Sequence, residues 1–406
     1  MTCSWFVHHI TQPNQSQALT EFFLLFRGQI RALEWPSLTV QWLPAAGAAP
    51  QGPCAHQGLL LGTHAAAGAQ NALLVADVKL PLRERAADGA APFLSVVERV
   101  PLPAPVCRAR HMPQNARLVA VAMLGAGVAL VRTGSHSQER EQDKEQEQVP
   151  MEEDEKEEGE AKAAVTRLDG CAGTEGTFGL SWAPEHPGTL LAGGLDGALC
   201  VWDVAAGTAG DGAAPKVSSQ GAPVSDACFH PRLADVAGVV RGGRALLWDT
   251  RTAPGSSGGE TVLGGSEEGE GSNSTCVSFS AAREARAVTG DGAGRVLVWD
   301  ARQAAAPVQR LCGHRGAVLQ VACSEGVAGA VASTAADRRV LVWDPARAGR
   351  PQTPAERAEG PPELLFVHGG HTALVADLAW NPHDPLTLAS VARDNILQLW
   401  QPASVL

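Results

Sequence analysis

The sequence predicts an all-β fold, a β-propeller of seven blades with four short strands each. The first observation is a strand-ending signature, a branched apolar residue followed by Trp and usually by Asp, which recurs five times. The second is a bulky residue 19 or 20 positions before each of these tryptophans, where an inner strand would end. The third is a polar register that repeats in the last two units. Together these observations indicate blades of the WD-repeat type.

Seven units can be followed along the chain. Two weaker units come first, with strands expected at Trp42 and at residues 58–64, 71–80, 111–113 and 118–131. Each of the five later units ends at one tryptophan, namely Trp202, Trp248, Trp299, Trp343 and Trp400. Their inner strands are expected to end at Trp182, Phe229, Phe279, Cys323 and Trp380. Three of these positions open a bulky-x-Pro step, and proline cannot donate to a strand ladder.

The propeller is assigned to residues 22–401, between an N-terminal segment, 1–21, and a short tail, 402–406. Residues 22–30 contain an apolar run that has no place in the first unit. We therefore expect them to complete the last blade and close the ring. Two segments lack periodicity and are expected to be disordered, the acidic loop 136–162 and the Gly-, Ser- and Glu-rich loop 253–274.

The last two units share a polar register of four residues. It places His, Ser, Asp and Trp at identical offsets, first as His314, Ser333, Asp337 and Trp343 and then as His371, Ser390, Asp394 and Trp400. Such side chains can form one hydrogen-bonded chain across a four-stranded sheet. Earlier units keep less of the register, since the third has only Asp196 and the fifth has Asp291 two places too early.

Charge and composition exclude several classes of function. Twelve acids give the loop 136–162 a net charge of −8, which leaves only −3 for the rest of the chain. A basic face for direct nucleic-acid binding is therefore not expected. Nine cysteines without a CxxC pair fit a reducing compartment. The longest apolar run, 118–131, is too short to span a bilayer, so no membrane partner is expected.

No catalytic constellation stands out, so the chain is not expected to be an enzyme. Gly290 to Gly294 resembles a nucleotide loop only superficially, because it lies between two expected strands and opens no helix. His368 and His371 are three positions apart, but no cysteine or acid completes a metal site with them. We therefore expect neither a metal nor another cofactor.

Five stretches carry a family resemblance: LEWPSLTVQWLP at 33–44, MPQN at 112–115, GLSW at 179–182, EGPPELLFVHGGH at 359–371 and DNILQLWQ at 394–401. They resemble the retinoblastoma-binding, histone-binding WD-repeat proteins, the MSI-like subunits of nucleosome-remodelling and chromatin-assembly complexes. The Gly-Pro-Pro-Glu-Leu-Leu run is the most specific part, because propeller geometry does not require it. The resemblance extends from Phe22 to Gln401, with poor stretches in the two aperiodic loops.

The resemblance implies a groove on the side of the last blade that holds a helix of histone four. One wall would be the proline-proline loop, formed by Glu359, Gly360, Pro361, Pro362, Glu363, Leu364, Leu365 and Phe366. Apolar residues beside acids suit an amphipathic basic helix. The other wall is an N-terminal helix in the family. Here residues 1–21 contain Pro13 and no acidic amphipathic pattern, although residues 14–21 could form a short substitute.

The resemblance implies a second site at the mouth of the propeller channel, which takes the basic tail of histone three. In this sequence Glu34, His64 and Arg108 match the family at that site, and Phe178 and Leu319 replace other aromatic residues. Family glutamates correspond here to Pro105, Ser225, Ala317 and Arg393. Because charge-assisted hydrogen bonds to a basic tail are lost with those carboxylates, tail binding of the family type should be weak or altered.

These expectations lead to one functional interpretation and one alternative. The chain would be a histone-binding scaffold of chromatin assembly, remodelling, deacetylase or Polycomb-type complexes, located in the nucleus and also in the cytoplasm. Its partners would be core histones and other proteins of those complexes. The alternative is a substrate receptor of a cullin–RING ligase, because Arg251 and Arg302 follow Trp-Asp in a pattern that resembles a ligase-adaptor docking motif.

Deletion of residues 136–162 should leave the midpoint of thermal unfolding unchanged, because a segment with twelve acids and few apolar residues adds nothing to a core. The deletion should also weaken the salt-sensitive association with histones at low ionic strength. Calorimetric melting and a histone pull-down at two salt concentrations measure these effects. A deletion variant that fails to fold, or one with unchanged histone affinity at low salt, would contradict the corresponding expectation.

Overall fold

The computed structural model describes residues 26–44, 54–65, 68–81, 94–134, 165–171, 176–204, 214–215, 217–254, 258–264 and 270–402. The acidic loop 136–162, the N-terminal segment 1–21 and residues 403–406 lie outside this part of the chain. No helix in the described part is long and apolar enough to cross a membrane.

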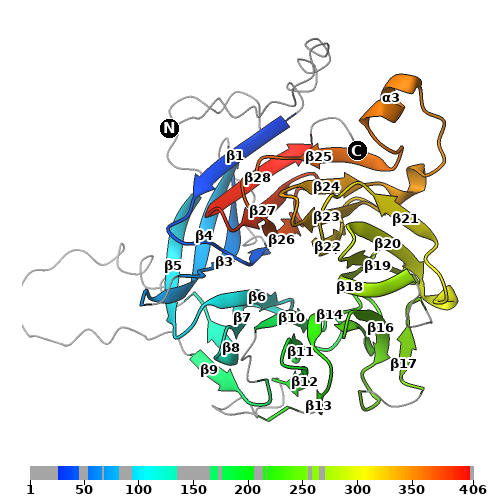
Figure 1. Ribbon diagram of the computed structural model, residues 1–406. Coiled ribbons are helices and arrows are strands. Elements are labelled where there is room, and N and C mark those ends of the chain that lie inside the picture. Colours follow the sequence, from blue (N-terminus) through cyan, green and yellow to red (C-terminus); the bar gives the residue numbers. More distant parts are fainter. Residues whose placement is uncertain are drawn as a thin grey trace, which may run out of the picture.

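The described strands form seven antiparallel blades around a central channel (Figure 1). The first three blades are β2–β5 (Val40–Trp42, Cys54–Gly62, Asn71–Pro81, Leu94–Leu102), β6–β9 (Val106–Met112, Asn115–Met123, Gly127–Arg132, Val165–Leu168) and β10–β13 (Thr177–Trp182, Thr189–Gly194, Ala198–Asp203, Val217–Gln220). The seven-bladed propeller predicted from the sequence is confirmed.

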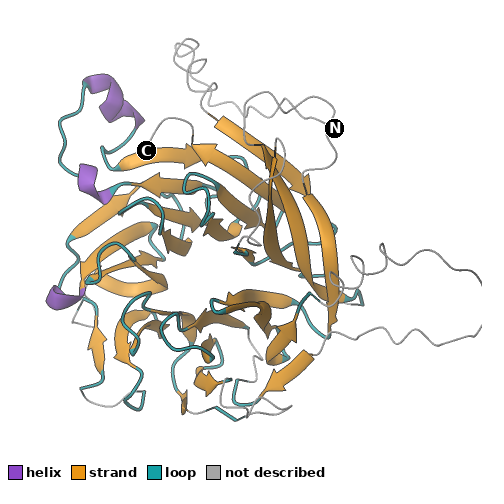
Figure 2. Ribbon diagram, turned by 180° about the vertical axis from the view of Figure 1, so that it is seen from behind, coloured by secondary structure: helices purple, strands orange, loops and turns teal. Residues whose placement is uncertain are grey.

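Blades four to six are β14–β17 (Val224–Phe229, Val236–Arg241, Arg244–Asp249, Glu260–Val262), β18–β21 (Glu270–Phe279, Arg286–Asp291, Arg295–Asp300, Gln309–Cys312) and β22–β25 (Val318–Cys323, Val331–Ala335, Val340–Trp343, Leu364–His368). Blade seven contains β26–β28 (Val375–Trp380, Leu388–Ala392, Ile396–Pro402). The helical elements of the described part are α3 (Pro354–Glu359) and the single 3-10 turns Ala301–Gln303 and Pro345–Arg347, which Figure 2 shows at the periphery of the ring.

The fourth strand of blade seven comes from the start of the chain. Strand β1 (Phe26–Ala32) pairs antiparallel with β28, from Phe26 opposite Pro402 to Ala32 opposite Ile396. The expected segment 22–30 therefore ends too early, because the ladder with β28 continues to Ala32, and residues 22–25 lie outside the described part. This pairing joins the two ends of the propeller, so the ring is closed by backbone hydrogen bonds.

The segment 253–274 contains regular structure, which corrects the expectation of an aperiodic loop. Strand β17 pairs with β16 to complete blade four, and Leu263 beyond it is buried. Strand β18 begins at Glu270, within the same segment. An edge strand needs only one partner and one apolar anchor, so a Gly- and Ser-rich composition was a poor guide here.

The hydrophobic core is divided among the interfaces between neighbouring blades. Val40 and Leu59 of blade one pack in one cluster with Ala389 and Leu399 of blade seven. Lateral hydrogen bonds add to this packing, because the indole N–H groups of inner-strand tryptophans donate to carbonyl oxygens of the preceding blade. These bonds join Trp42 to Ala379 at 3.3 Å, Trp182 to Arg110 at 2.9 Å and Trp380 to Ala322 at 3.0 Å.

The polar register of blade six forms one connected hydrogen-bonded chain. Trp343 Nε1 donates to Ser333 Oγ at 2.9 Å, and His314 Nε2 lies 2.8 Å from the same oxygen. His314 Nδ1 is 3.1 Å from Asp337 Oδ2, which also accepts the backbone N–H of Arg315 at 2.9 Å. Burial favours a raised pKa for Asp337, but the hydrogen bond from His314 and the Arg315 amide hold the pKa below its ordinary value.

Blade seven repeats this arrangement. Trp400 Nε1 donates to Ser390 Oγ at 3.1 Å, and His371 Nε2 lies 2.8 Å from that oxygen. The contact of His371 Nδ1 with Asp394 Oδ2 is looser, an ion-pair distance of 3.4 Å without hydrogen-bond geometry. Burial again opposes ionisation, yet the partners of Asp394 hold its pKa at about 2.

Blade five keeps half of the same chain, which the sequence reasoning overlooked. Trp299 Nε1 donates to Thr289 Oγ1 at 2.9 Å, and Thr289 stands ten positions before its tryptophan, as Ser333 and Ser390 do. Asp291 is buried and instead pairs with Arg295 at 2.7 Å. Threonine supplies the same hydroxyl group as serine, so spacing alone could have located it.

Asp337→Ala should lower the free energy of unfolding by about 1–3 kcal/mol, because the substitution leaves His314 and two backbone amides without their acceptor. Since the folded-state pKa of Asp337 is lowered, this stabilisation is present above the unfolded-state pKa of about 3.9 and is lost as pH falls through the folded-state value. Urea denaturation from neutral to acid pH measures both effects. Asp235→Ala, at a partly exposed carboxylate, is the matched control and should change stability by less than about 0.5 kcal/mol.

Candidate peptide-binding sites

The proline-proline loop connects β24 to β25, so it belongs to blade six, although the sequence reasoning assigned its groove to the last blade. Figure 1 shows this loop with α3 beyond the outer edge of the ring, near β25. Helix α3 begins with a capping box, in which Thr353 Oγ1 accepts from Glu356 N and the Glu356 carboxylate accepts from Thr353 N at 2.7 Å. Six residues cannot form a stable helix alone, so the cap and the loop contacts hold α3 in place.

Gly360 is required where the chain leaves α3. Its φ of 154° lies outside the range that side-chain-bearing residues ordinarily adopt, and an added Cβ would lie 2.9 Å from Leu364 Cδ2. Gln352 Nε2 donates to the Gly360 carbonyl at 3.0 Å and draws the two arms of the loop together. The loop is therefore held in a defined shape before any ligand binds.

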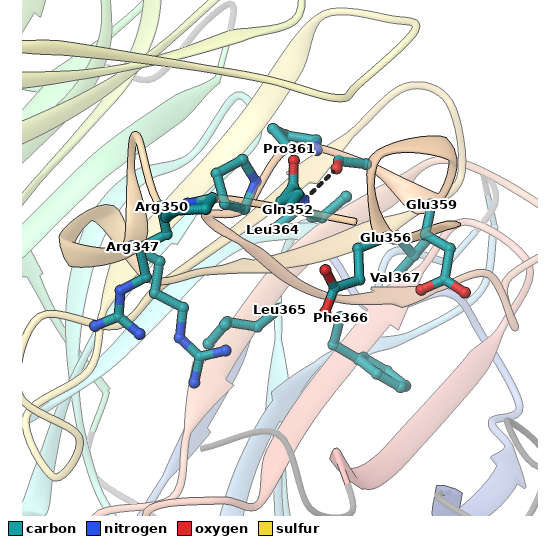
Figure 3. Close-up of a pocket in the computed structure, with 13 residues that line it drawn as sticks. Arg347, Arg350, Gln352, Glu356, Glu359, Pro361, Leu364, Leu365, Phe366 and Val367 are labelled. Carbon is teal, nitrogen blue, oxygen red and sulfur yellow. Dashed lines mark hydrogen bonds between the residues drawn. The ribbon is translucent and has the colours of Figure 1, made fainter. Parts of the chain in front are cut away.

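A cavity of about 270 Å³ lies against this loop. Its lining contains charged residues from two walls, Arg347 and Arg350 on one and Glu356 and Glu359 on the other (Figure 3). Arg347 also pairs with Asp344 at 3.2 Å. The two arginines were not expected from the sequence, because only residues 359–366 were considered, and they make the groove bipolar where an acidic groove was expected.

The apolar part of the groove differs from the expectation. Leu365 and Phe366 are buried inside the blade, and the Phe366 ring stacks on Trp400 with centroids 5.6 Å apart. They line the cavity only with their remaining surface. Leu364 is half-buried and Val367 is 39% exposed, so these two side chains can contribute more new apolar burial to a ligand. The reason is a bulge in the β24–β25 ladder at Leu364, which re-aims the following residues.

A repeated bulge builds the mouth of the channel. Six of the inner strands in the described part have a register shift directly after their first residue, between Val106 and Arg108 and at the equivalent places in blades three to seven. The residues at the bulges are Cys107, Phe178, Ser225, Thr275, Leu319 and Ala376. None of these six side chains is a carboxylate, so the bulge ring is neutral. The positions that follow the bulges include Arg108, Gln320 and Asp377.

Arg108 is not available at the channel mouth, which corrects its assignment to the peptide site. Its side chain is 7% exposed and lies 2.9 Å from the buried carboxylate of Asp377 in blade seven. Arg108 Nε also donates to the Phe178 carbonyl at 3.0 Å, and Nη2 donates to Gln320 Oε1 at 3.1 Å. Arg108 therefore links four blades through their inner strands. Sequence spacing could not reveal this, because the partners lie 70 to 269 positions away.

Asp377 is the anion at the centre of this network. Its second partner is Arg110, at 3.1 Å, and Oδ2 also accepts the backbone N–H of Val40 at 3.0 Å. Burial alone would raise the pKa of Asp377, but the two arginines hold it below the ordinary value. Asp226 has the equivalent place in blade four and accepts from Val277 N at 2.9 Å, although burial raises its pKa. Both aspartates therefore connect neighbouring inner strands, which deepens their interpretation as strand-start anchors.

The other mouth residues expected from the resemblance are partly accessible. Glu34 is exposed and pairs with Arg99 at 3.1 Å. Phe178 and Leu319 are half-buried, and Arg393 is exposed. Burial, followed by the positive charge of Arg393, lowers the pKa of His64. The structure therefore brings His64 and Arg393 together from adjacent blades and leaves Glu34 engaged with another strand.

The arginines of the two Trp-Asp-x-Arg stretches fold back onto their own aspartates. Arg251 Nη2 is 2.6 Å from Asp249 Oδ2, and Arg302 Nη2 is 2.6 Å from Asp300 Oδ2. Hydrogen bonds from these arginines lower the pKa of each aspartate to about 2. Both guanidinium groups are largely exposed, at 70% and 78%.

The paired histidines have polar partners within the protein. His368 Nε2 lies 2.6 Å from Gln398 Oε1, and the ring stacks on Trp400 with centroids 4.5 Å apart. His371 is part of the blade-seven chain described above. In the described ranges no group of three or more His, Cys, Asp or Glu side chains is placed to hold a metal ion.

Two family profiles match the chain. The profile of the WD domain, or G-beta repeat, matches residues 362–401, which contain β26–β28. The profile of the histone-binding protein RBBP4, which is also the C component of the CAF1 complex, matches residues 30–82, from the end of β1 through β4.

The ring of seven four-stranded sheets and the repeat match define a WD-repeat β-propeller. Within that class the chain belongs to the histone-binding WD-repeat family, because the second profile matches the ring-closing strand and most of blade one. This assignment confirms the resemblance seen in the sequence.

Asp377→Asn should lower the free energy of unfolding by about 3–5 kcal/mol, because it leaves Arg108 and Arg110 buried without a carboxylate. Chemical denaturation at neutral pH measures the loss. Glu34→Gln removes an exposed ion pair and should cost at most about 1 kcal/mol. Equal effects of the two substitutions would show that the channel network does not stabilise the ring.

Proposed function

We propose that this protein is a non-catalytic scaffold that binds core histones and presents them to the other proteins of chromatin assembly, remodelling, deacetylase or Polycomb-type complexes. The observation that carries the proposal is the preorganised proline-proline loop with its cavity, in a chain whose blade-one region matches the histone-binding profile. Such a scaffold acts in the nucleus, with the cytoplasm as a second compartment.

The ligand proposed for the groove is a short amphipathic helix of histone four. Leu364 and Val367 supply apolar surface, and Glu356 and Glu359 supply negative charge for basic side chains on the helix. Arg347 and Arg350 would repel a helix that is basic along its whole length. The groove should therefore favour a helix whose basic residues are concentrated at one end.

A ligase-receptor role is the second candidate. Arg251 and Arg302 follow the third strands of neighbouring blades, so their exposed guanidinium groups lie on the same face of the ring. That face is separate from the channel mouth, where the bulges of the inner strands lie. Affinity purification from nuclear extract distinguishes the two roles, since one should recover histones with chromatin proteins and the other a cullin-ligase adaptor.

A histone-four helix peptide should bind measurably, whereas a histone-three tail peptide should bind little or not at all, because the bulge ring of the channel mouth offers no carboxylates. Titration calorimetry with both peptides tests this. Glu359→Arg should weaken the helix peptide by about fivefold, and Glu325→Arg, at another exposed glutamate, should leave it unchanged. A tail peptide that binds more tightly than the helix peptide would overturn the proposal.

A further inference from the structure

One turn position at the channel mouth is occupied by an unexpected residue. Five positions before the strand-ending tryptophan, blades three to seven all place a residue with positive φ: Gly197 (83°), Gly243 (74°), Gly294 (85°), Arg338 (68°) and Asn395 (62°). Glycine adopts this left-handed conformation freely, and asparagine tolerates it. Arginine does neither, because its Cβ meets the backbone. Arg338 is therefore kept where the turn itself favours glycine.

Such local strain is found where a side chain serves a function. Arg338 is exposed at the top of blade six, and Arg315 is exposed on the adjoining loop. Both flank Asp337, whose carboxylate is 8% exposed and fully engaged by His314, Arg315 N and Arg339 N. The buried acid therefore leaves the two guanidinium groups available at the surface.

The positive surface continues into blade seven. Arg393 is exposed beside Asp394, whose side chain is only 6% exposed and accepts from Thr372 N and Ile396 N. Arg393 is also close enough to His64 of blade one to lower its pKa, after burial. We call Arg315, Arg338 and Arg393 the mouth arginines. Glu34, an exposed acid on this side of blade one, is already paired with Arg99.

The channel below the mouth arginines cannot accept a basic side chain. Asp377 is saturated by Arg108, Arg110 and Val40 N, and Asp226 by Ala227 N and Val277 N. An incoming lysine or arginine would meet the bound Arg108 guanidinium and then the mouth arginines. Carboxylates of a ligand would instead find three exposed cations over a neutral, partly apolar ring that includes Phe178 and Leu319.

We propose that the channel mouth of blades six and seven binds an acidic peptide segment of a partner protein. A peptide fits better than a nucleic acid, because three cations are few for a phosphate backbone and the chain carries a net charge of −11. The apolar rim at Leu319 suits an acidic segment that also carries an apolar side chain. The proposal goes beyond the histone-helix groove and does not depend on it.

The test uses the full chain and three short peptides of one design, rich in glutamate, in glutamine or in lysine. The glutamate peptide should bind best, and its affinity should fall steeply as salt rises, since exposed charges are screened. Arg393→Glu should weaken it by about fivefold or more. Arg232→Glu, at an exposed arginine between β14 and β15 on the opposite face, is the matched control and should leave the affinity unchanged.

Arg338→Gly separates this role from a structural one. It relieves the backbone strain, so the melting temperature should stay the same or rise, while the affinity for the glutamate peptide should fall. Binding of the glutamate peptide that is equal in wild type, Arg338→Gly and Arg393→Glu would overturn the proposal. Tighter binding of the lysine peptide, or of a single-stranded oligonucleotide, would also overturn it. The histone-four helix peptide, titrated in the same variants, should be unaffected, so its failure would concern only the groove.

Discussion

The pairing of β1 with β28 holds both ends of the propeller, and much of the remaining structure depends on it. Without β1, the third strand of blade seven would lose its outer partner along seven residue pairs. Blade one would also lose support, because Val40 and Leu59 pack against Ala389 and Leu399 of blade seven. The closed ring brings Asp377 to Val40 and Arg110, so the contents of the channel follow from closure.

Closure also determines which charges a ligand can meet. The channel aspartates accept hydrogen bonds and ion pairs from neighbouring strands, and Arg108 occupies the space between four blades. Charge that remains accessible lies elsewhere, on the mouth arginines and at the bipolar groove beside α3. The two surfaces therefore differ in sign and in shape, which allows one scaffold to hold two unlike peptides at once.

The blades satisfy the same requirement in different ways. Each strand-ending tryptophan has a buried indole N–H that needs an acceptor. A serine or threonine hydroxyl accepts in blades five to seven, and a backbone carbonyl accepts in blade three, from Asp169, and in blade four, from Thr252. The polar register can therefore decay in individual blades without loss of the fold, because the backbone provides substitutes.

The sequence by itself determined the fold class, the number of blades and the ends of most strands, because these follow from local periodicity, from proline and from tryptophan spacing. It also located the proline-proline loop and both polar registers. Only the tertiary structure decided that Arg108 is buried, that Phe366 stacks on Trp400 and that Arg347 lines the groove. The backbone strain at Arg338 was equally out of reach. Those facts depend on contacts between residues far apart in the chain, and a repeat pattern contains no information about which side chains from different blades meet.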